Sequence, residues 1–397
     1  MPNSADLHGP NTPLRCRRRA PSAPALAAML AATLTAATFS QAQAQGVSGT
    51  SLQLYGLVDA SVGRFEGAAA GVNARDRAST KLESGSMSTS HWGVRGSEDL
   101  GGGLSASFDL SAFVRNDIGA FGRNDAIGAP VNVAADPMFS RAAWMGIAHP
   151  AWGRVRLGNV TSLLFVNSVT SNAFGDSTVL SPLNLTTLIG SPMTGGTAWA
   201  NSVVYDSPVW NGVSFAAAHA ISEKQGGGNH ALRAAYARGP MAASLAVQSV
   251  KRNPLTFADG TSPNDTRTWQ LAASYDFSAV KLFAHLGGIR NRGTAAQPLD
   301  VSYRLWELSA AVPMGSGRLL AGFASRRTGD AVLPVPATAA GGNLARKVLT
   351  VGYDHLLSKR TDVYLMLMRD QTRTHTVGAQ ELAAQGTGIA LGMRHRF

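Results

Sequence analysis

The feature that most constrains this chain is an alternation of apolar and polar residues, with a period of two, that recurs along most of its length. Residues 51–64, 266–277 and 386–397 show it clearly. A period of two places successive side chains on opposite faces of a β-strand. The segments are about 9–13 residues long, the length that a tilted strand needs to cross a bilayer. The chain is therefore expected to consist of strands with two chemically different faces.

The connections between these segments are of two kinds that alternate strictly along the chain. Seven short connections are expected at residues 99–103, 150–153, 207–212, 238–241, 276–279, 313–317 and 354–361. Eight long connections are expected at residues 65–79, 115–137, 161–200, 221–228, 251–265, 291–300, 328–344 and 371–384. Together they imply 16 strands. Short turns at one rim and long loops at the other are typical of an up-and-down antiparallel barrel.

Composition favours a barrel in a membrane over a soluble sandwich. The 43 glycines suit many strands and turns, and no stretch of 18 consecutive apolar residues could form a spanning helix. A mean hydropathy near zero agrees with strands whose two faces cancel. A closed barrel pairs every backbone amide and leaves no edge strand, so it needs no disulfides, and Cys16 is the chain's single cysteine. A barrel of this strand number is too wide for side chains to fill, so its interior is expected to hold water.

The first 44 residues are expected to be a removable export signal. Four arginines at positions 15–19 precede an apolar run over residues 25–39, and Ala42-Gln43-Ala44 supplies the small residues that signal peptidase requires. The run is too short and too weakly apolar to anchor the chain in a bilayer. Cleavage would leave residues 45–397 as the barrel domain, with 31 basic and 23 acidic residues and a net charge of +8. Export and the lack of a basic block argue against nucleic-acid binding.

Five motifs in the same order resemble the general porins of β-proteobacteria. They are LYGLVDA at 54–60, WGVRGSEDLGGG at 92–103, NSVVYDSP at 201–208, YDHLLSKRTDVY at 353–364 and GMRHRF at 392–397. The resemblance covers the whole chain after the signal. It implies a homotrimer of transmembrane barrels in the outer membrane, with short periplasmic turns, long extracellular loops and a third loop that folds inward. That loop would be 161–200, the longest expected connection.

The resemblance also indicates which residues would form the pore constriction. In this family basic residues on the barrel wall face acidic residues on the inward loop. Arg141 matches the family's wall arginine, and we expect its side chain to point inward because Trp144 has the opposite parity and would face lipid. Arg154 and Arg156 share one face of the next strand, and Asp176 is the sole acid of the loop. His91 stands where the family usually has arginine and could carry charge only when protonated.

The chain's end resembles the signal that the barrel-assembly machinery reads. Met393 and Phe397 belong to the apolar face of the last segment, and His395 lies between them. The other expected partners are outer-membrane lipid and lipopolysaccharide, small polar solutes and ions, and no nucleic acid.

The function expected from these features is passive diffusion of small hydrophilic solutes and ions, with a weak preference for anions. Two alternatives stay open: a substrate-specific outer-membrane channel and a barrel that serves as a surface anchor or adhesin. An enzyme is not expected, because no segment combines a nucleophile with a base and an orienting group. No cofactor or metal is expected either, because no segment has paired ligand spacing.

Overall fold

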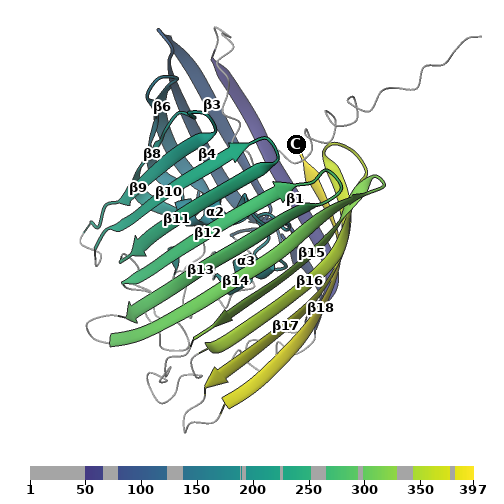
Figure 1. Cartoon of the computed structure of the whole chain (residues 1–397). Helices are drawn as coiled ribbons and strands as arrows, with labels where there is room; N and C mark the ends of the chain where they lie inside the picture. The colour runs from purple at the N-terminus through teal and green to yellow at the C-terminus, as the bar shows by residue number, and fades with distance from the viewer. Residues whose placement is uncertain are drawn as a thin grey trace, which may run out of the picture. The chain divides into compact units, whose positions relative to one another are not determined.

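The computed structural model describes the chain over residues 50–65, 79–122, 137–187, 189, 194–223, 227–251, 265–293, 298–328, 343–375 and 381–397. The expected export signal at 1–44 lies outside these residues. Most of the described chain is β-strand (Figure 1). The first nine strands are β1 (Ser51–Phe65), β2 (Ser79–Ser84), β3 (His91–Gly101), β4 (Leu104–Arg115), β5 (Ala120–Phe121), β6 (Ala142–His149), β7 (Gly153–Thr161), β8 (Ala198–Asp206) and β9 (Val213–Ala220). The others are β10 (Asn229–Arg238), β11 (Met241–Val250), β12 (Thr266–Asp276), β13 (Lys281–Gly293), β14 (Pro298–Met314), β15 (Gly317–Arg327), β16 (Asn343–Leu356), β17 (Thr361–His375) and β18 (Glu381–Arg396).

The strands form one antiparallel sheet that closes on itself. Each long strand pairs with its neighbours in sequence, and the first strand β1 pairs with the last strand β18, from Leu57 opposite Arg396 to Phe65 opposite Gly388. Figure 1 shows the purple β1 beside the yellow β18. Strands β2 and β3 share the partner β1 and act as one interrupted strand, and the two-residue β5 only extends the pairing of β4. The barrel therefore has the 16 spanning strands that the sequence predicts.

The interruption between β2 and β3 is a dent in the wall, formed by residues 85–90. It starts at Gly85, whose φ of 77° suits a residue without a side chain. The dent is held by Asp59 of β1, whose carboxylate accepts hydrogen bonds from the backbone amides of Met87 and Ser88 at 2.8 and 2.7 Å. Tyr364 donates a further bond to the same carboxylate at 2.7 Å. These hydrogen bonds hold the dent in place inside the lumen.

The two faces of the strands differ as the alternation predicts. On β12, Trp269, Leu271 and Tyr275 are exposed on the outer surface, whereas Thr268 and Gln270 are buried toward the lumen. On β1 and β18 the same rule exposes Leu54 and Leu391. Covering the apolar outer face with lipid tails instead of water stabilises the barrel by about 25 cal/mol for each Å² of apolar surface removed from water. The hydrophobic effect thus fixes which side of each strand faces out.

The two kinds of connection are also observed, with a correction at two loops. All seven short turns join the strands that the sequence predicts. Two of the expected long loops are shorter, because strand pairing continues into them: β13 runs to Gly293 and β14 starts at Pro298, while β17 runs to His375 and β18 starts at Glu381. The polar composition of these segments predicts a loop, but backbone pairing between neighbours outweighs it.

The connection between β7 and β8 folds into the barrel, as expected. It contains two short helices, α2 (Leu163–Val169) and α3 (Pro182–Thr186). Helix α2 packs against β9–β12 and α3 against β14–β16. Figure 1 shows both helices behind the front strands of the barrel. No helix in the described part of the chain is long and apolar enough to span a bilayer.

Candidate pore constriction

The inward loop is fixed to the wall by polar contacts with side chains from strands far away in the sequence. On α2, Ser168 donates to Gln270 of β12 at 3.0 Å, and Arg233 of β10 donates to Asn167 at 3.2 Å. At α3, the guanidinium of Arg326 donates to the Thr186 carbonyl at 3.0 Å. Carbonyls of a short helix lack partners at its C-terminal end, so this arginine satisfies one of them. The loop is therefore a fixed part of the lumen.

An apolar cluster holds the middle of the loop against the dent and the wall. Phe174 and Leu180 are buried against Met87 of the dent, Leu320 of β15 and Tyr364 of β17. Ser177 also donates to the Ser86 carbonyl at 2.6 Å. Burying a side chain such as Phe174 contributes roughly 1.5–3 kcal/mol. This stretch of the loop therefore occupies part of the lumen.

One face of the loop stays partly exposed toward the open part of the lumen. It contains two kinds of group: an apolar stripe on α2 and a turn that carries one acid. Its members are Phe165, Val166, Val169, Thr170, Gly175 and Asp176. The loop therefore offers the pore few charges.

The wall of β7 and β8 carries a compact ion-pair cluster. Arg154 and Arg156 both approach the carboxylate of Asp206, with the closest N–O distances at 3.1 and 2.9 Å. The Arg156 side chain is almost fully buried, and Arg154 is about one third exposed. Two cations share one anion here, so the cluster keeps a net charge of +1. Asp206 lies in the quoted NSVVYDSP motif, with the parity opposite to the exposed Val203 and Tyr205. Parity could have predicted its inward direction.

The indole of Trp144 faces the lumen, which corrects the sequence-based expectation that it faces lipid. The guanidinium carbons of Arg154 and Arg156 lie 5.6 and 5.4 Å from the centre of its ring. On β6 the exposed residues are Met145 and Ile147, so the even-numbered positions point inward. The expectation failed because it extended strand parity back to Arg141, which lies in a bend just before β6 begins at Ala142.

Arg141 does point inward, although parity does not cause it. Its guanidinium donates to the Tyr55 hydroxyl and to Ser111, both at 3.3 Å. Tyr55 in turn donates to Asp109 at 2.7 Å, and Arg95 lies 4.8 Å from the centre of the Tyr55 ring. Within the described part of the chain, no carboxylate lies within ion-pair distance of Arg141 or Arg95. These two cations are partnered by neutral groups.

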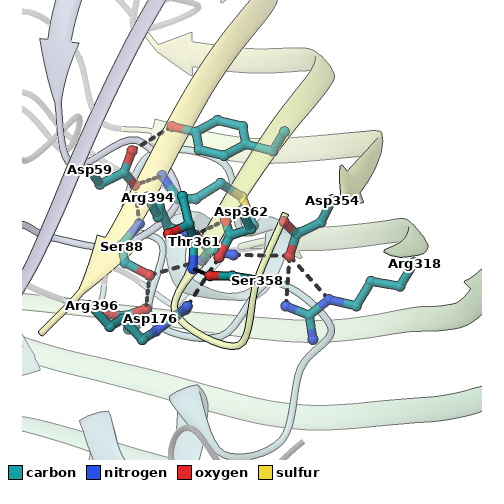
Figure 2. A network of polar contacts seen from close by, with 12 residues as sticks. Asp59, Ser88, Asp176, Arg318, Asp354, Ser358, Thr361, Asp362, Arg394 and Arg396 are labelled. Atoms are coloured by element: carbon teal, nitrogen blue, oxygen red, sulfur yellow. Dashed lines mark hydrogen bonds and ion pairs between the residues drawn. The ribbon is translucent and has the colours of Figure 1, made fainter. Parts of the chain in front are cut away.

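His91 and Asp176 occupy different places from the arginines. His91 packs edge-on against Tyr55 with ring centres 6.2 Å apart, and one ring nitrogen lies 2.9 Å from the Thr89 carbonyl. It therefore shares Tyr55 with Arg141. Asp176 accepts a hydrogen bond from Ser88 of the dent at 2.8 Å, as Figure 2 shows. The structure thus brings Arg141 and His91 to one ring, groups Arg154 with Arg156, and places Asp176 on the loop.

Behind Asp176 lies an ion-pair network that sequence reasoning missed (Figure 2). Arg394 of β18 bridges Asp362 at 2.7 Å and Asp354 at 2.9 Å, and donates to Ser88 at 3.1 Å. Arg318 and Arg396 complete the pairing of the two aspartates, at 2.8 and 3.0 Å. The alternation in the YDHLLSKRTDVY and GMRHRF motifs predicts that their polar residues point inward. It does not predict which of these side chains contact one another.

The C-terminal residues lie at the seam where the barrel closes. Phe397 exchanges two backbone hydrogen bonds with Gly56 of β1, at 3.1 and 3.2 Å. Gly56 is required there, because a Cβ at this position would lie 2.7 Å from the His91 carbonyl oxygen and 2.4 Å from the Phe397 ring. Met393 is exposed on the outer face, and His395 lies 2.9 Å from the Thr361 hydroxyl.

The arrangement can select solutes but has no features of bond chemistry. Within the described residues no group of three His, Cys, Asp or Glu side chains is placed to hold a metal ion. The lumen contains a wall rich in arginine and an inward loop that narrows the pore. Such a site acts through its width and its electrostatic potential.

Comparisons with known proteins cover nearly the whole chain. A family described as Gram-negative porin matches residues 25–375. An outer membrane porin protein of Bordetella pertussis is 26% identical over 420 residues, which cover 93% of this chain and 99% of the relative. The anion-selective porin from Comamonas acidovorans has a similar fold, with a TM-score of 0.68 at 24% identity over 88% of this chain and 100% of that one. The trimer form of OmpT from Vibrio cholerae gives a TM-score of 0.59 at 12% identity, over 88% and 100% of the two chains.

Proposed function

This chain belongs to the family of Gram-negative porins, and we propose that its pore is a passive route for small hydrophilic solutes with a modest preference for anions. As a porin it is an outer-membrane channel and not an enzyme. The preference for anions is the part that depends on individual residues of this chain.

The observation that carries the proposal is the excess of arginine on the open wall of the lumen. Five arginines lie on β3, β7 and β10 and in the bend before β6, namely Arg95, Arg141, Arg154, Arg156 and Arg233. Among the described residues that contact them or face them, the acids are Asp109, Asp206 and the loop's Asp176. The wall therefore keeps a positive balance.

A positive balance on a confined wall favours anions in the pore. Low-dielectric walls focus the potential of their charges into the channel and enrich the ions of opposite sign. At physiological salt the Debye length is about 8 Å, so a few charges act over a distance similar to the pore itself. The preference is accordingly modest and fades at high salt. The similar porin from Comamonas acidovorans is described as anion-selective, which is the same direction.

The test is the reversal potential of single channels in a planar bilayer with unequal salt on the two sides. Arg141→Glu changes the charge of the open wall by two units, close to the neutral Tyr55 and Ser111. We expect it to shift the reversal potential toward cation preference. The matched variant is Arg373→Glu, which makes the same change in charge at an exposed position near the C-terminal end of β17.

The two variants separate a local filter from a surface effect. A large shift for Arg141→Glu and a small shift for Arg373→Glu support the wall arginines as the source of selectivity. Equal shifts would mean that the whole surface charge sets the preference, and Arg141 would lose its role. His91 is expected to act as a polar lining residue beside Arg141.

We also propose that the chain assembles as a homotrimer after export through the periplasm. A similar porin-fold protein, OmpT, has been solved in a trimer form. Residues 1–44 would be the export signal, and the barrel-assembly machinery would read the terminal strand with Met393, His395 and Phe397. Phe397→Asp tests the role of the terminal strand, because it removes the C-terminal apolar side chain at the seam between β1 and β18. Normal outer-membrane yield and a heat-resistant oligomer from this variant would contradict it.

A further inference from the structure

Two histidines on neighbouring strands meet on the outer face of the barrel. They are His219 of β9 and His230 of β10, and both are exposed. Each has the parity of an outward apolar residue on its own strand, Phe215 on β9 and Leu232 on β10. Their side chains therefore point away from the lumen and take no part in the proposed selectivity of the pore.

The strand register places the two histidines directly opposite each other. Their Nδ1 atoms are 3.1 Å apart, and the ring centres are 4.6 Å apart with an angle of 29° between the planes. The two residues are 11 positions apart in the sequence, so neither segment by itself has the spacing of a metal site. The juxtaposition comes from the pairing of β9 with β10, which lie side by side in Figure 1.

Two Nδ1 atoms at this distance need a positively charged or hydrogen-bonding species between them. A neutral imidazole has a proton on one nitrogen and a lone pair on the other, and two lone pairs that face each other repel. In the metal-free protein one Nδ1 donates its proton to the other. A metal ion can take the place of that proton if the donating ring moves it to Nε2, which gives the other neutral tautomer. The contact is therefore a preformed pair of nitrogen ligands.

The separation of the two nitrogens suits two ligands of one metal ion. Zinc–imidazole bonds are about 2.0–2.1 Å long, so their nitrogens lie about 2.9 Å apart at a right angle and about 3.3 Å apart at a tetrahedral angle. The observed 3.1 Å lies between these two values. Small rotations of the rings would therefore be enough to direct both lone pairs at one ion.

Small neighbours leave room for water molecules that would complete the coordination. Gly228 is the outward position before His230, and a Cβ added there would lie 3.0 Å from Cε1 and 3.7 Å from Nδ1 of His219. On the other side, the small Ser249 stands opposite His230. Among the described residues no third His, Cys, Asp or Glu completes a group of three around the pair. Water would therefore fill the remaining positions.

The charges near the pair have opposite signs. Asn201 of β8 donates to the carboxylate of Glu223, which is exposed just beyond the end of β9 and places an acid at the same rim. Arg267 lies at the level of His230 in the register but on β12, two strands away. With a spacing of about 4.8 Å between strands, the two backbones are roughly 10 Å apart. Salt largely screens exposed charges at that distance, so the arginine opposes a bound cation only weakly.

We propose that His219 and His230 bind a late first-row divalent cation such as Zn²⁺, Ni²⁺ or Cu²⁺. Imidazole nitrogen suits these ions, whereas Ca²⁺ and Mg²⁺ prefer oxygen ligands. The pair lies at the rim of the long connections, which in outer-membrane barrels faces the medium. The ion would cross-link the ends of β9 and β10 beside the 221–228 connection. This site lies outside the lumen and goes beyond the proposed channel function.

The test is a calorimetric titration of the untagged, detergent-purified channel with Ni²⁺, and with Mg²⁺ as the reference ion. The wild type should bind one Ni²⁺ per chain and no Mg²⁺. We expect His219→Gln and His230→Gln each to lose at least about ten-fold in affinity for Ni²⁺, because each leaves a single nitrogen ligand. The double variant should bind no more weakly than a channel that has only its other histidines.

The matched control removes two other histidines that do not form a pair. It is His149→Gln with His355→Gln, since His149 stacks on Trp152 and His355 packs against Tyr353. We expect this variant to bind Ni²⁺ as the wild type does. Electron paramagnetic resonance of Cu²⁺ on the wild type gives a second readout, and its spectrum should show two coordinated nitrogens.

Three outcomes would overturn the proposal. Equal Ni²⁺ affinity in the wild type and in the two single variants would mean that the rings form only a hydrogen-bonded stack. An equal loss in the control would mean that Ni²⁺ binds to scattered surface histidines. A Cu²⁺ spectrum with a single nitrogen would exclude the paired site, and this measurement does not depend on whether any variant folds.

Discussion

Two walls of the same lumen use arginine in opposite ways. On the closing wall, formed by β15–β18, Arg394 is 4% exposed and bridges two aspartates that are themselves buried, with Asp354 at 0% and Asp362 at 1%. On the open wall, among the described residues, Arg141 donates to the neutral Tyr55 and Ser111. On the closing wall three arginines and two aspartates therefore share one ion-pair network, whereas Arg141 on the open wall has neutral partners and keeps its charge available to solutes.

The role of each of these arginines depends on its partners. Two charges taken out of water are costly, and a buried pair is tolerated only when its geometry and hydrogen bonds are good. Arg394 meets that condition through Asp354, Asp362 and Ser88. Arg141 remains partly exposed and needs no counter-ion. We therefore expect substitutions on the closing wall to change stability and substitutions on the open wall to change selectivity.

The largest effect should come from removing the inward loop, which covers the closing wall and faces the open one. Replacing the residues between Ser171 and Ser191 with a short glycine linker removes the buried Phe174 and Leu180. We expect a higher conductance and entry of larger sugars in liposome-swelling assays, because the loop occupies part of the lumen. Shortening the 251–265 connection at the same rim is the control. An unchanged size limit would mean that the loop does not set the constriction.

Arg394→Gln should be the most damaging point substitution of those on the two walls. It leaves buried carboxylates short of a partner, and breaking a buried ion pair costs about 3–5 kcal/mol. Arg141→Gln should cost much less, about 1 kcal/mol, because it loses only hydrogen bonds to neutral groups. Urea unfolding of the protein in lipid vesicles measures both. If Arg141→Gln proves as destabilising as Arg394→Gln, the distinction between the two walls is wrong.

Asp206→Asn should make the open wall more basic. It removes the acid that Arg154 and Arg156 share, so the reversal potential should move toward anion preference. We expect about half the size of the Arg141→Glu shift and the opposite sign, since the charge changes by one unit instead of two. Glu98→Gln makes the same change on the outer face and is the control. A shift toward cations would contradict the assignment of Asp206 to the pore wall.

The smallest effect should come from Asp176→Asn. The carboxylate faces the pore but accepts a hydrogen bond from Ser88, which also accepts from Arg394 of the ion-pair network. Its removal should move the reversal potential toward anions by less than Asp206→Asn does. The same planar-bilayer recordings, with Glu98→Gln as reference, measure it. A shift larger than that of Asp206→Asn would make the loop acid the dominant charge of the constriction.

Most of the fold could be predicted from the sequence because its causes are local. A period of two decides which side chains share a face, and the spacing of turn residues decides where strands end. This predicted the strand number, the seven short turns, the long third loop and the inward direction of Arg154 and Arg156. It failed where local regularity stops. Arg141 lies in a bend before β6, so parity counted from it placed Trp144 on the wrong face.

The partners of each charge depended on the tertiary structure. Arg394 of β18 reaches Asp354 of β16 across β17, and closure of the barrel between β1 and β18 brings Asp59 beside them. The pairing of Arg154 and Arg156 with Asp206 likewise needs the register of β7 against β8. Alternation specifies the face of a side chain, whereas a Coulomb interaction depends on the distance to another charge. The sequence alone therefore determined the barrel and its polar lining, and the tertiary structure decided which of the lining arginines are neutralised and which still act on the pore.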